Sequence, residues 1–191
     1  MTLLRPMKTN KIILGFVSEI GGGKGTLTKY IEQKYDAKTF RFSTILRDIL
    51  DRVYLPDTRE NMQILSTKLR ETFGQEILSK TISQDIQASD SKIIVLDGIR
   101  RIEDTAYLKN IPGFYVIAIE ADERIRFERL NSRGENPDDT KKTWEEFQKD
   151  IQYETEMTIR EVAKIADFKI DNNGSLEETY RQVDKIVASI Q

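Results

Sequence analysis

Short apolar runs alternate along the chain with longer stretches in which apolar residues recur at every third or fourth position. The short runs predict five buried strands, at residues 11–17, 37–42, 91–96, 114–119 and 167–170. The periodic stretches between them predict helices. Because strands alternate with helices, the sequence predicts an α/β fold with a parallel sheet covered on both faces and ligands at the carboxyl ends of its strands.

The predicted helices follow the strands in regular order and differ in length. They cover residues 26–35, 43–53, two segments between 57 and 88, 102–110, 122–132, about 143–165 and 176–190. The pattern Thr143-x-x-Glu146 is typical of a helix start and opens the longest of them. Asp57-x-x-Glu60 is the corresponding signal for the first of the pair. No repeat or interdomain linker interrupts the pattern, so we expect a single domain over residues 1–191.

Composition and charge narrow the range of partners. The chain has 191 residues, 38% hydrophobic and 32% charged, which is enough for one sizeable core. Its net charge of -2 gives no general attraction to nucleic acid or to a lipid surface, so we expect neither as a partner. Residues 1–10 contain one apolar pair, and no run approaches the roughly 18 residues of a membrane span. We expect a short tail before a soluble domain.

The chain contains no cysteine and no histidine. The first absence excludes disulfides and thiolate zinc sites and fits a reducing cytoplasm, where we expect the protein to act. The second excludes Ser-His triads and removes the commonest metal ligand. The chemistry must therefore be carried out by carboxylates, lysine, arginine, hydroxyls and backbone amides.

A stretch of three consecutive glycines follows the first predicted strand, in SEIGGGKGT at residues 18–26, which we call the glycine loop. Glycines permit positive φ and let several N–H groups turn toward an anion, while the helix beginning near Lys24 contributes about +0.5 charge at its amino end. Lys24 would reach the β and γ phosphates of ATP, and Thr26 could bind Mg²⁺. Ser18 and Gly25 depart from the usual G-x-x-x-x-G-K-[ST] pattern, and a tight turn without a ligand is the alternative. The residues expected to bind the cofactor are Ile20, Gly21, Gly22, Gly23, Lys24, Gly25 and Thr26.

A second candidate site, LDGIRR at residues 96–101, ends the third predicted strand. Asp97 at such a strand end can hold Mg²⁺ through water, with Thr26 as its natural partner, and Gly98 lets the backbone approach a substrate closely. The alternative is an ordinary Asp-Gly turn followed by two solvated arginines.

These two stretches resemble the G-x-G-K-G-T and L-D-G-[FY]-P-R signatures of the P-loop nucleoside monophosphate kinases, such as adenylate kinase, and the element order fits over residues 11–190. The resemblance implies a three-layer P-loop kinase fold, ATP and Mg²⁺ as cofactors, and a nucleoside or deoxynucleoside monophosphate as phosphate acceptor. In that family the last arginine of the second signature holds the acceptor phosphate, which matches Arg101. Arg100 replaces the usual proline, so which of the two arginines faces the acceptor stays open.

The resemblance extends to the regions that close over the substrates. Residues 128–134 resemble the start of the family's lid, here about 129–142, in which one arginine lies near the ATP base and others clamp the phosphates. Arg129 and Arg133 are the candidates for these roles. The two would share a helix face, although a solvated charged helix is an equally open reading. The lid is short and has no zinc ligands. Arg124 and Arg126 are expected to be solvated neighbours.

The acceptor side resembles the family less closely. The helix after the second strand offers Ser43 and Arg47 as candidates for the monophosphate, and the helices at about 43–88 would form a mobile acceptor-binding region. Residues 166–178 are similar to the ending of dephospho-CoA kinases and related archaeal proteins, which would bring residues 172–174 near the nucleotide base. An ordinary strand-to-helix turn is the equally open alternative there.

The identity of the acceptor depends on whether a base is available. A sugar hydroxyl must lose a proton, whereas a phosphate is already an anionic nucleophile. Dephospho-CoA kinases resemble one another in having an aspartate at the end of the second strand. This chain has Ser43 and Thr44 there, and its nearest carboxylate, Asp48, comes one turn later. This favours a monophosphate acceptor, although Asp97 or Glu19 could act as a base. A dephospho-CoA kinase and a nucleotide-binding switch without an acceptor stay open as alternatives.

Overall fold

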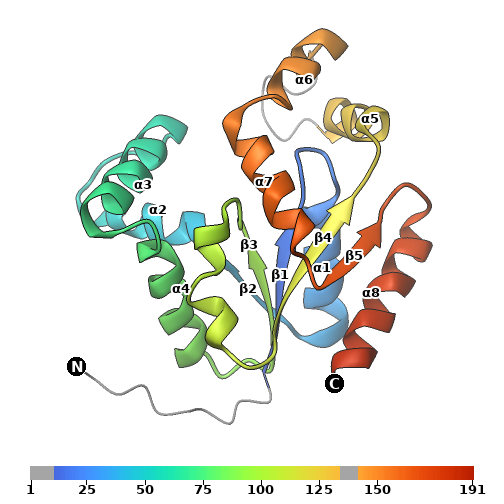
Figure 1. Ribbon diagram of the computed structural model, residues 1–191, viewed down its shortest axis with the longest axis horizontal. Helices are drawn as coiled ribbons and strands as arrows, with labels where there is room; N and C mark the ends of the chain where they lie inside the picture. The colour runs from blue at the N-terminus through green and yellow to red at the C-terminus, as the bar shows by residue number, and fades with distance from the viewer. Residues whose placement is uncertain (1–10, 134–141) are drawn as a thin grey trace.

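The computed structural model describes residues 11–133 and 142–191 and contains one sheet of five parallel strands. The strands lie in the order β2-β3-β1-β4-β5 (Figure 1). Their bounds are β1 Ile12–Val17, β2 Lys38–Arg41, β3 Ile93–Asp97, β4 Phe114–Glu120 and β5 Phe168–Asp171. The predicted fold class, a parallel five-stranded sheet with helices on both faces, is confirmed.

The central strand β1 is buried along its whole length because it pairs with β3 on one side and β4 on the other. Its side chains alternate between the two faces of the sheet, as strand geometry requires. Ile13 and Val17 belong to the apolar core on one face, and Leu14 and Phe16 belong to the core on the other. The continuous apolar run at the start of the chain therefore encodes a strand that is covered on both sides.

Helices from distant parts of the chain cover each face. On one face, α1 Lys24–Tyr35 and α8 Leu176–Ile190 contribute Leu27, Ile31 and Val183 to the core. On the other face, α4 Ile77–Ala88 and α7 Glu154–Lys164 contribute Ile82 and Val162. These layers leave the carboxyl ends of the strands to the connecting loops, where ligands bind in folds of this kind.

Two groups of helices project on opposite sides of that edge (Figure 1). On one side lie α2 Phe42–Arg52 and α3 Arg59–Phe73, and on the other lie α5 Glu123–Arg133 and α6 Trp144–Asp150. The second group has an apolar cluster of its own, the lid cluster, built on the buried side chains of Leu130, Phe147 and Ile151 with Ile20 of the glycine loop packed against them.

Two helix predictions were wrong. Residues 102–110 form two 3₁₀ segments, η1 Ile102–Thr105 and η2 Leu108–Asn110, in which amides bond to carbonyls three residues back. Residues 143–165 form two helices, because the chain turns after Asp150 so that Ile151 enters the lid cluster while α7 covers the sheet. The tertiary positions of these segments overrode a continuous local pattern.

Several element boundaries differ from the prediction. The helix α3 begins one residue later than expected, with Thr58 as its N-cap accepting a hydrogen bond from the amide of Asn61. The strand β2 ends at Arg41 and α2 begins at Phe42, so Ser43 and Thr44 lie inside the helix and not at the strand end. The predicted loop after Arg133, with most of the predicted lid, falls on residues 134–141, outside the described residues.

Within the described ranges, none of the helices has the length and apolarity needed to cross a membrane.

Candidate nucleotide and acceptor site

The glycine loop leads from β1 directly into the amino end of α1. Gly23 precedes the helix with φ 96, and a Cβ atom there would lie 2.2 Å from Nδ2 of Asn172. That same amide group of Asn172 donates a hydrogen bond to the carbonyl of Gly22 at 2.9 Å. Because the N-cap position is a glycine, no side chain caps the first turn of α1. The backbone geometry therefore fits an anion, and a phosphate in particular, at this helix end.

The lysine and the aspartate singled out in the sequence lie together. Nζ of Lys24 is 2.9 Å from Oδ1 of Asp97. The pairing follows from the sheet, since the parallel register sets Phe16 of β1 beside Asp97 of β3 and brings the two following loops to the same edge. The expected partner of Asp97 was Thr26, which lies in the first turn of the same helix as Lys24. Carboxylate and hydroxyl oxygens are the kinds of ligand that suit Mg²⁺.

A third residue, Arg41, contacts the same aspartate and was not predicted from the sequence. The register of β2 on β3 sets Arg41 beside Asp97, and Nε of the arginine is 3.4 Å from Oδ2 of the aspartate. Asp97 is thus flanked by two cations. A basic residue at a strand end facing the ligand edge could have signalled this, but the predicted strand ran one residue too far.

We call the loop after β3, residues 97–101, the acceptor loop, after the role expected from the sequence. Gly98 has φ 95. A Cβ atom at this position would lie 3.8 Å from its nearest neighbour, the side chain of Phe42, so it would fit without a clash. Glycine is therefore favoured there by the backbone conformation alone. The amides of Arg100 and Arg101 donate to Oδ2 of Asp104 at 3.0 and 3.1 Å. The side chain of Arg100 is exposed, and that of Arg101 is half-buried.

The acceptor loop is fixed to α3 through a buried ion pair. Arg70 donates to the other carboxylate oxygen of Asp104 at 2.6 Å, and only 9% and 3% of the two side chains are exposed. Arg70 also donates to the carbonyl of Gln75 at the turn between α3 and α4. The sequence carries no local signal of this pair because its members are 34 residues apart.

The candidate acceptor residues on α2 lie together at its amino end. Arg47 is 3.5 Å from the hydroxyl of Ser43, and its Nε atom is 3.3 Å from Asp57. Asp48, the carboxylate that follows, lies close enough to Asp85 of α4 to reinforce the effect of burial in raising the pKa of that residue. Asp48 is therefore on the side of α2 that faces α4.

Arg126 was expected to be solvated, and this prediction was wrong. Only 2% of the residue is exposed, its Nη1 atom donates to the carbonyl of Ile20, and its Nη2 atom is 3.4 Å from Glu19. The guanidinium also lies over the ring of Phe147 at 5.7 Å. Arg124 lies over the ring of Trp144 at 4.8 Å. Helix α5 uses these arginines to pack against the glycine loop and α6.

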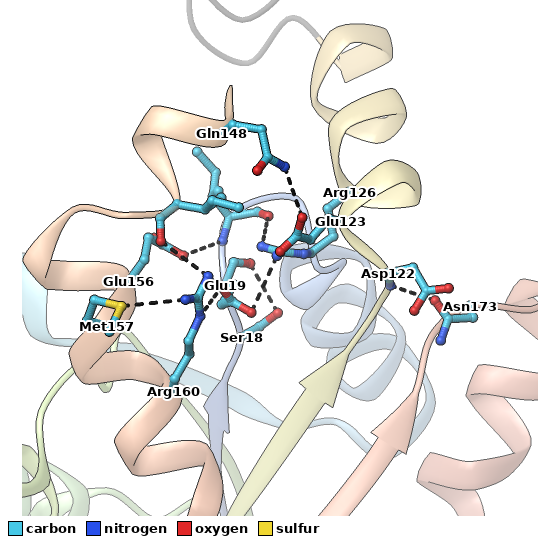
Figure 2. A network of polar contacts seen from close by, with 12 residues as sticks. Ser18, Glu19, Asp122, Glu123, Arg126, Gln148, Glu156, Met157, Arg160 and Asn173 are labelled. Carbon is cyan, nitrogen blue, oxygen red and sulfur yellow. Dashed lines mark hydrogen bonds and ion pairs between the residues drawn. The ribbon is translucent and has the colours of Figure 1, made fainter. Parts of the chain in front are cut away.

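Helix α7 contacts the glycine loop from a second direction (Figure 2). Arg160 donates to Glu19 at 2.8 Å, and the carboxylate of Glu156 accepts a hydrogen bond from the amide of Ile20 at 3.0 Å. Burial raises the pKa of Glu156 above its ordinary value, although the bond from Ile20 and the charges of Arg126 and Arg100 oppose that shift. The tip of the loop is thus held by three charged side chains from two helices.

The predicted lid arginines both belong to α5. Arg129 lines a cavity of about 150 Å³ beside the glycine loop. The other lining residues are Gly23, Thr26, Leu27, Ser132, Asn172 and Leu176. Arg133 is the last residue of the helix, and its side chain lies outside the described part of the structure. Asn172, which lines this cavity, is one of the residues 172–174 that the sequence analysis places near the nucleotide base.

The sheet, the covering helices and the glycine loop together define a domain with the P-loop kinase fold. The chain belongs to the family whose model is described as an AAA domain, which matches residues 21–148, more than half of the chain. It is more closely described as a member of the UPF0200 family. The chain is 30% identical over 175 residues to UPF0200 protein TK1334 of Thermococcus kodakarensis, covering 89% of this chain and 93% of that one. It is 27% identical to a UPF0200 protein of Hyperthermus butylicus, over 95% and 96% of the two chains.

Solved structures share the fold at low sequence identity. Shikimate kinase from Bacteroides thetaiotaomicron superposes with a TM-score of 0.62 at 12% identity, covering 94% of this chain and 98% of that one. TT1252 from Thermus thermophilus gives 0.57 at 15% identity, over 95% and 98% of the chains. The P-loop kinase fold expected from the sequence is therefore confirmed.

Proposed function

We propose that the protein is an ATP-dependent phosphotransferase that moves the γ-phosphate of ATP to a nucleoside or deoxynucleoside monophosphate. The observation that carries the proposal is the meeting of Lys24 and Asp97 at 2.9 Å beside a glycine loop that opens an uncapped helix. A lysine, a metal-binding carboxylate and a helix amino end are the parts that phosphoryl transfer requires.

In the proposed reaction a phosphate oxygen of the acceptor forms a bond to the γ-phosphorus, and the bond from that phosphorus to the β-γ bridging oxygen breaks. The electron pair of the broken bond stays on the bridging oxygen, which leaves as part of ADP. The products are ADP and a nucleoside diphosphate, and a dianionic acceptor phosphate releases no proton. The protein therefore needs to position the two phosphates and offset their charge.

The proposed roles follow from these needs. Lys24, with the amides of the glycine loop, binds the β and γ phosphates. Thr26 and Asp97 would hold Mg²⁺, and the ion would supply neutralisation of the phosphate charge. Arg129 and Arg133 contact the nucleotide from α5, whereas the acceptor is bound by Ser43 and Arg47 of α2 together with Gly98, Arg100 and Arg101 of the acceptor loop.

The ion pairs made by the two candidate base carboxylates support a phosphate acceptor over a hydroxyl acceptor. Asp97 is paired with Lys24 and Arg41, and Glu19 is paired with Arg126 and Arg160. Both oxygens of each carboxylate therefore lie against a cation, and a proton from an acceptor hydroxyl would have to compete with an ion pair for either oxygen. A dephospho-CoA kinase would need a base to take the proton of its sugar hydroxyl. This argument makes that enzyme the second candidate.

Release of ADP, coupled to NADH oxidation, tests the proposal across a panel of acceptors. The panel holds the ribonucleoside and deoxyribonucleoside monophosphates, dephospho-CoA, shikimate and a sample with no acceptor. We expect release that depends on a monophosphate. Release with dephospho-CoA alone would establish the second candidate, and release that needs no acceptor would establish a nucleotide-dependent switch.

Two variants test the proposed machinery in the same assay. Lys24→Ala and Arg101→Ala should lower turnover by at least about a hundredfold, because each removes a charge that acts on the transferring or accepting phosphate. Lys164→Ala is the matched control, since Lys164 pairs with Glu161 on the exposed side of α7. Normal turnover by both site variants, with their circular dichroism unchanged, would rule out the mechanism.

A further inference from the structure

Arg41 occupies the place where β2 meets the acceptor helices. It is the last residue of the strand, and Phe42, which begins α2, is buried in the apolar core with 6% of its surface exposed. Phe40 of the same strand packs against this core, and because successive side chains of a strand point to opposite sides, Arg41 points away from it. Its side chain is 52% exposed at the carboxyl edge of the sheet.

The contact of Arg41 with Asp97 is weak enough for the arginine to exchange the aspartate for another anionic partner. The contact is made by Nε at 3.4 Å, which is longer than a strong charge-assisted hydrogen bond. A guanidinium carries five N–H donors in a fixed plane, so its two amino groups offer a fork that matches the oxygens of a phosphate. An exposed pair of this kind contributes little stability, so exchanging the partner costs little.

The charges around Asp97 favour an additional anion. One carboxylate faces two cations, Lys24 at 2.9 Å and Arg41 at 3.4 Å. Lys24 belongs to the glycine loop, whereas Arg41 leads into α2, so the two cations stand on different sides of the aspartate. Arg100 and Arg101 follow Asp97 in the acceptor loop and add positive charge on the same edge. Of the two cations that contact Asp97, Arg41 is the one on the acceptor side.

We propose that Arg41 binds the phosphate of the acceptor and thereby selects a phosphate monoester over an uncharged alcohol. This inference rests on the proposed function and names the residue that sets its acceptor class. When the acceptor binds, the guanidinium exchanges Asp97 for the acceptor's phosphate oxygens. The strand end that would carry a carboxylate base in an enzyme acting on a hydroxyl carries a cation here.

Nuclear magnetic resonance tests this without requiring turnover. Each of the four ribonucleoside monophosphates and, as its control, the corresponding nucleoside is titrated into the ¹⁵N-labelled protein. The Nε–H signal of Arg41 is assigned by its absence in Arg41→Gln. We expect at least one monophosphate to shift this signal and its nucleoside to leave it in place. A signal that no monophosphate moves would overturn the inference.

Kinetics give the second test once an active acceptor is known from the panel. Arg41→Gln should raise the KM for the monophosphate at least about tenfold, and leave the KM for ATP within about twofold, because one charge-assisted contact is lost on the acceptor side alone. Arg41→Lys should recover part of the loss. Arg52→Gln, at the exposed far end of α2, is the matched control.

The outcomes separate this inference from the proposed function. An unchanged acceptor KM in Arg41→Gln would overturn the inference while leaving a monophosphate kinase in place. An equal rise in both KM values would also overturn it, because Arg41 would then act on the nucleotide side through Asp97. If no acceptor supports turnover and a monophosphate still shifts the Arg41 signal, the proposed function fails and the anion site stands.

Discussion

At the scale of single residues, the chemistry of this protein depends on which charges are paired and which backbone positions exclude a side chain. The three consecutive glycines of the glycine loop differ in what they allow. Gly21 and Gly23 have positive φ, whereas a Cβ atom on Gly22 would lie 2.0 Å from the hydroxyl oxygen of Ser18. Gly21 and Gly23 therefore require glycine because of their backbone conformation, whereas a side chain at Gly22 would displace the hydroxyl of Ser18.

Gly23→Ala should weaken both the fold and ATP binding. The substitution places a Cβ atom 2.2 Å from the side chain of Asn172 at a residue with φ 96. Left-handed backbone and this overlap together should lower the free energy of unfolding by about 1–3 kcal/mol. Urea denaturation measures the loss. Gly25→Ala, inside the first turn of α1, is the control and should leave stability unchanged or slightly raised.

Glu156 should make the free energy of unfolding depend on pH. Burial raises the pKa of this carboxyl in the folded protein. Its contribution to stability is therefore fully present below the unfolded pKa of about 4.3 and is lost as pH rises through the folded pKa. Glu156→Gln keeps an oxygen that can accept from Ile20 and does not ionise, so its stability relative to the parent protein should grow from pH 4 to pH 7.

Glu178 provides the control of opposite sign. Its carboxylate accepts a hydrogen bond from the amide of Ser175, which lowers its pKa. Its contribution is present above the unfolded pKa and is lost as pH falls through the folded pKa. Urea titrations of Glu156→Gln and Glu178→Gln at both pH values should thus give stability differences that change in opposite directions. A difference for Glu156→Gln that is constant with pH would contradict the assignment.

At the scale of elements, the arrangement is decided by contacts between segments that are far apart in sequence. The acceptor loop is attached to α3 through Arg70 and Asp104, and the glycine loop is attached to α5 and α7 through Glu19 and Ile20. Each loop that would touch a substrate is therefore tied to one of the two projecting groups of helices. Movement of a helix group would move the corresponding loop.

Asp104→Asn tests the first of these attachments. The substitution leaves the guanidinium of Arg70 buried without its counter-charge, which should lower the free energy of unfolding by about 3–5 kcal/mol. It should also raise the KM for the acceptor more than that for ATP, because the amides of Arg100 and Arg101 lose a charged partner. Urea denaturation and steady-state kinetics measure the two effects.

The double variant Arg70→Met with Asp104→Asn tests whether the two residues stabilise the protein as an ion pair or independently of each other. Removing the arginine relieves the uncompensated charge, so the double variant should be more stable than Asp104→Asn alone. Additive losses would show that the two residues stabilise the protein independently. In that case the acceptor loop would not be coupled to α3 through this pair.

At the scale of the whole molecule, the glycine loop connects the central sheet with helices α5 and α7. A ligand that binds the folded protein alone raises its stability by an amount set by concentration and affinity, about 2.7 kcal/mol at one hundred times the Kd. Mg-ATP should therefore raise the Tm in a concentration-dependent way. Lys24→Ala should reduce this shift strongly at the same ATP concentration, and differential scanning calorimetry measures both. An undiminished shift would place the nucleotide elsewhere.

Much of the fold was predictable because its signals are local. The five strands and the capping boxes at Thr143 and Ser175 are encoded by neighbouring residues, and the structure contains all of them. The break between α6 and α7 was not predictable, because the periodic pattern is continuous there and only packing of Ile151 into the lid cluster interrupts it. The same holds for the end of β2, which is set by burial of Phe42.

The sequence by itself determined the order of strands and helices and the glycine loop, because hydrophobic periodicity and the absence of a Cβ atom act within a few residues. Only the tertiary structure decided which charges meet. The parallel register brought Arg41 to Asp97, and helix packing brought Arg126 to a loop 106 residues away. Ion pairs across such separations leave no local pattern, since either partner alone resembles an ordinary solvated charge.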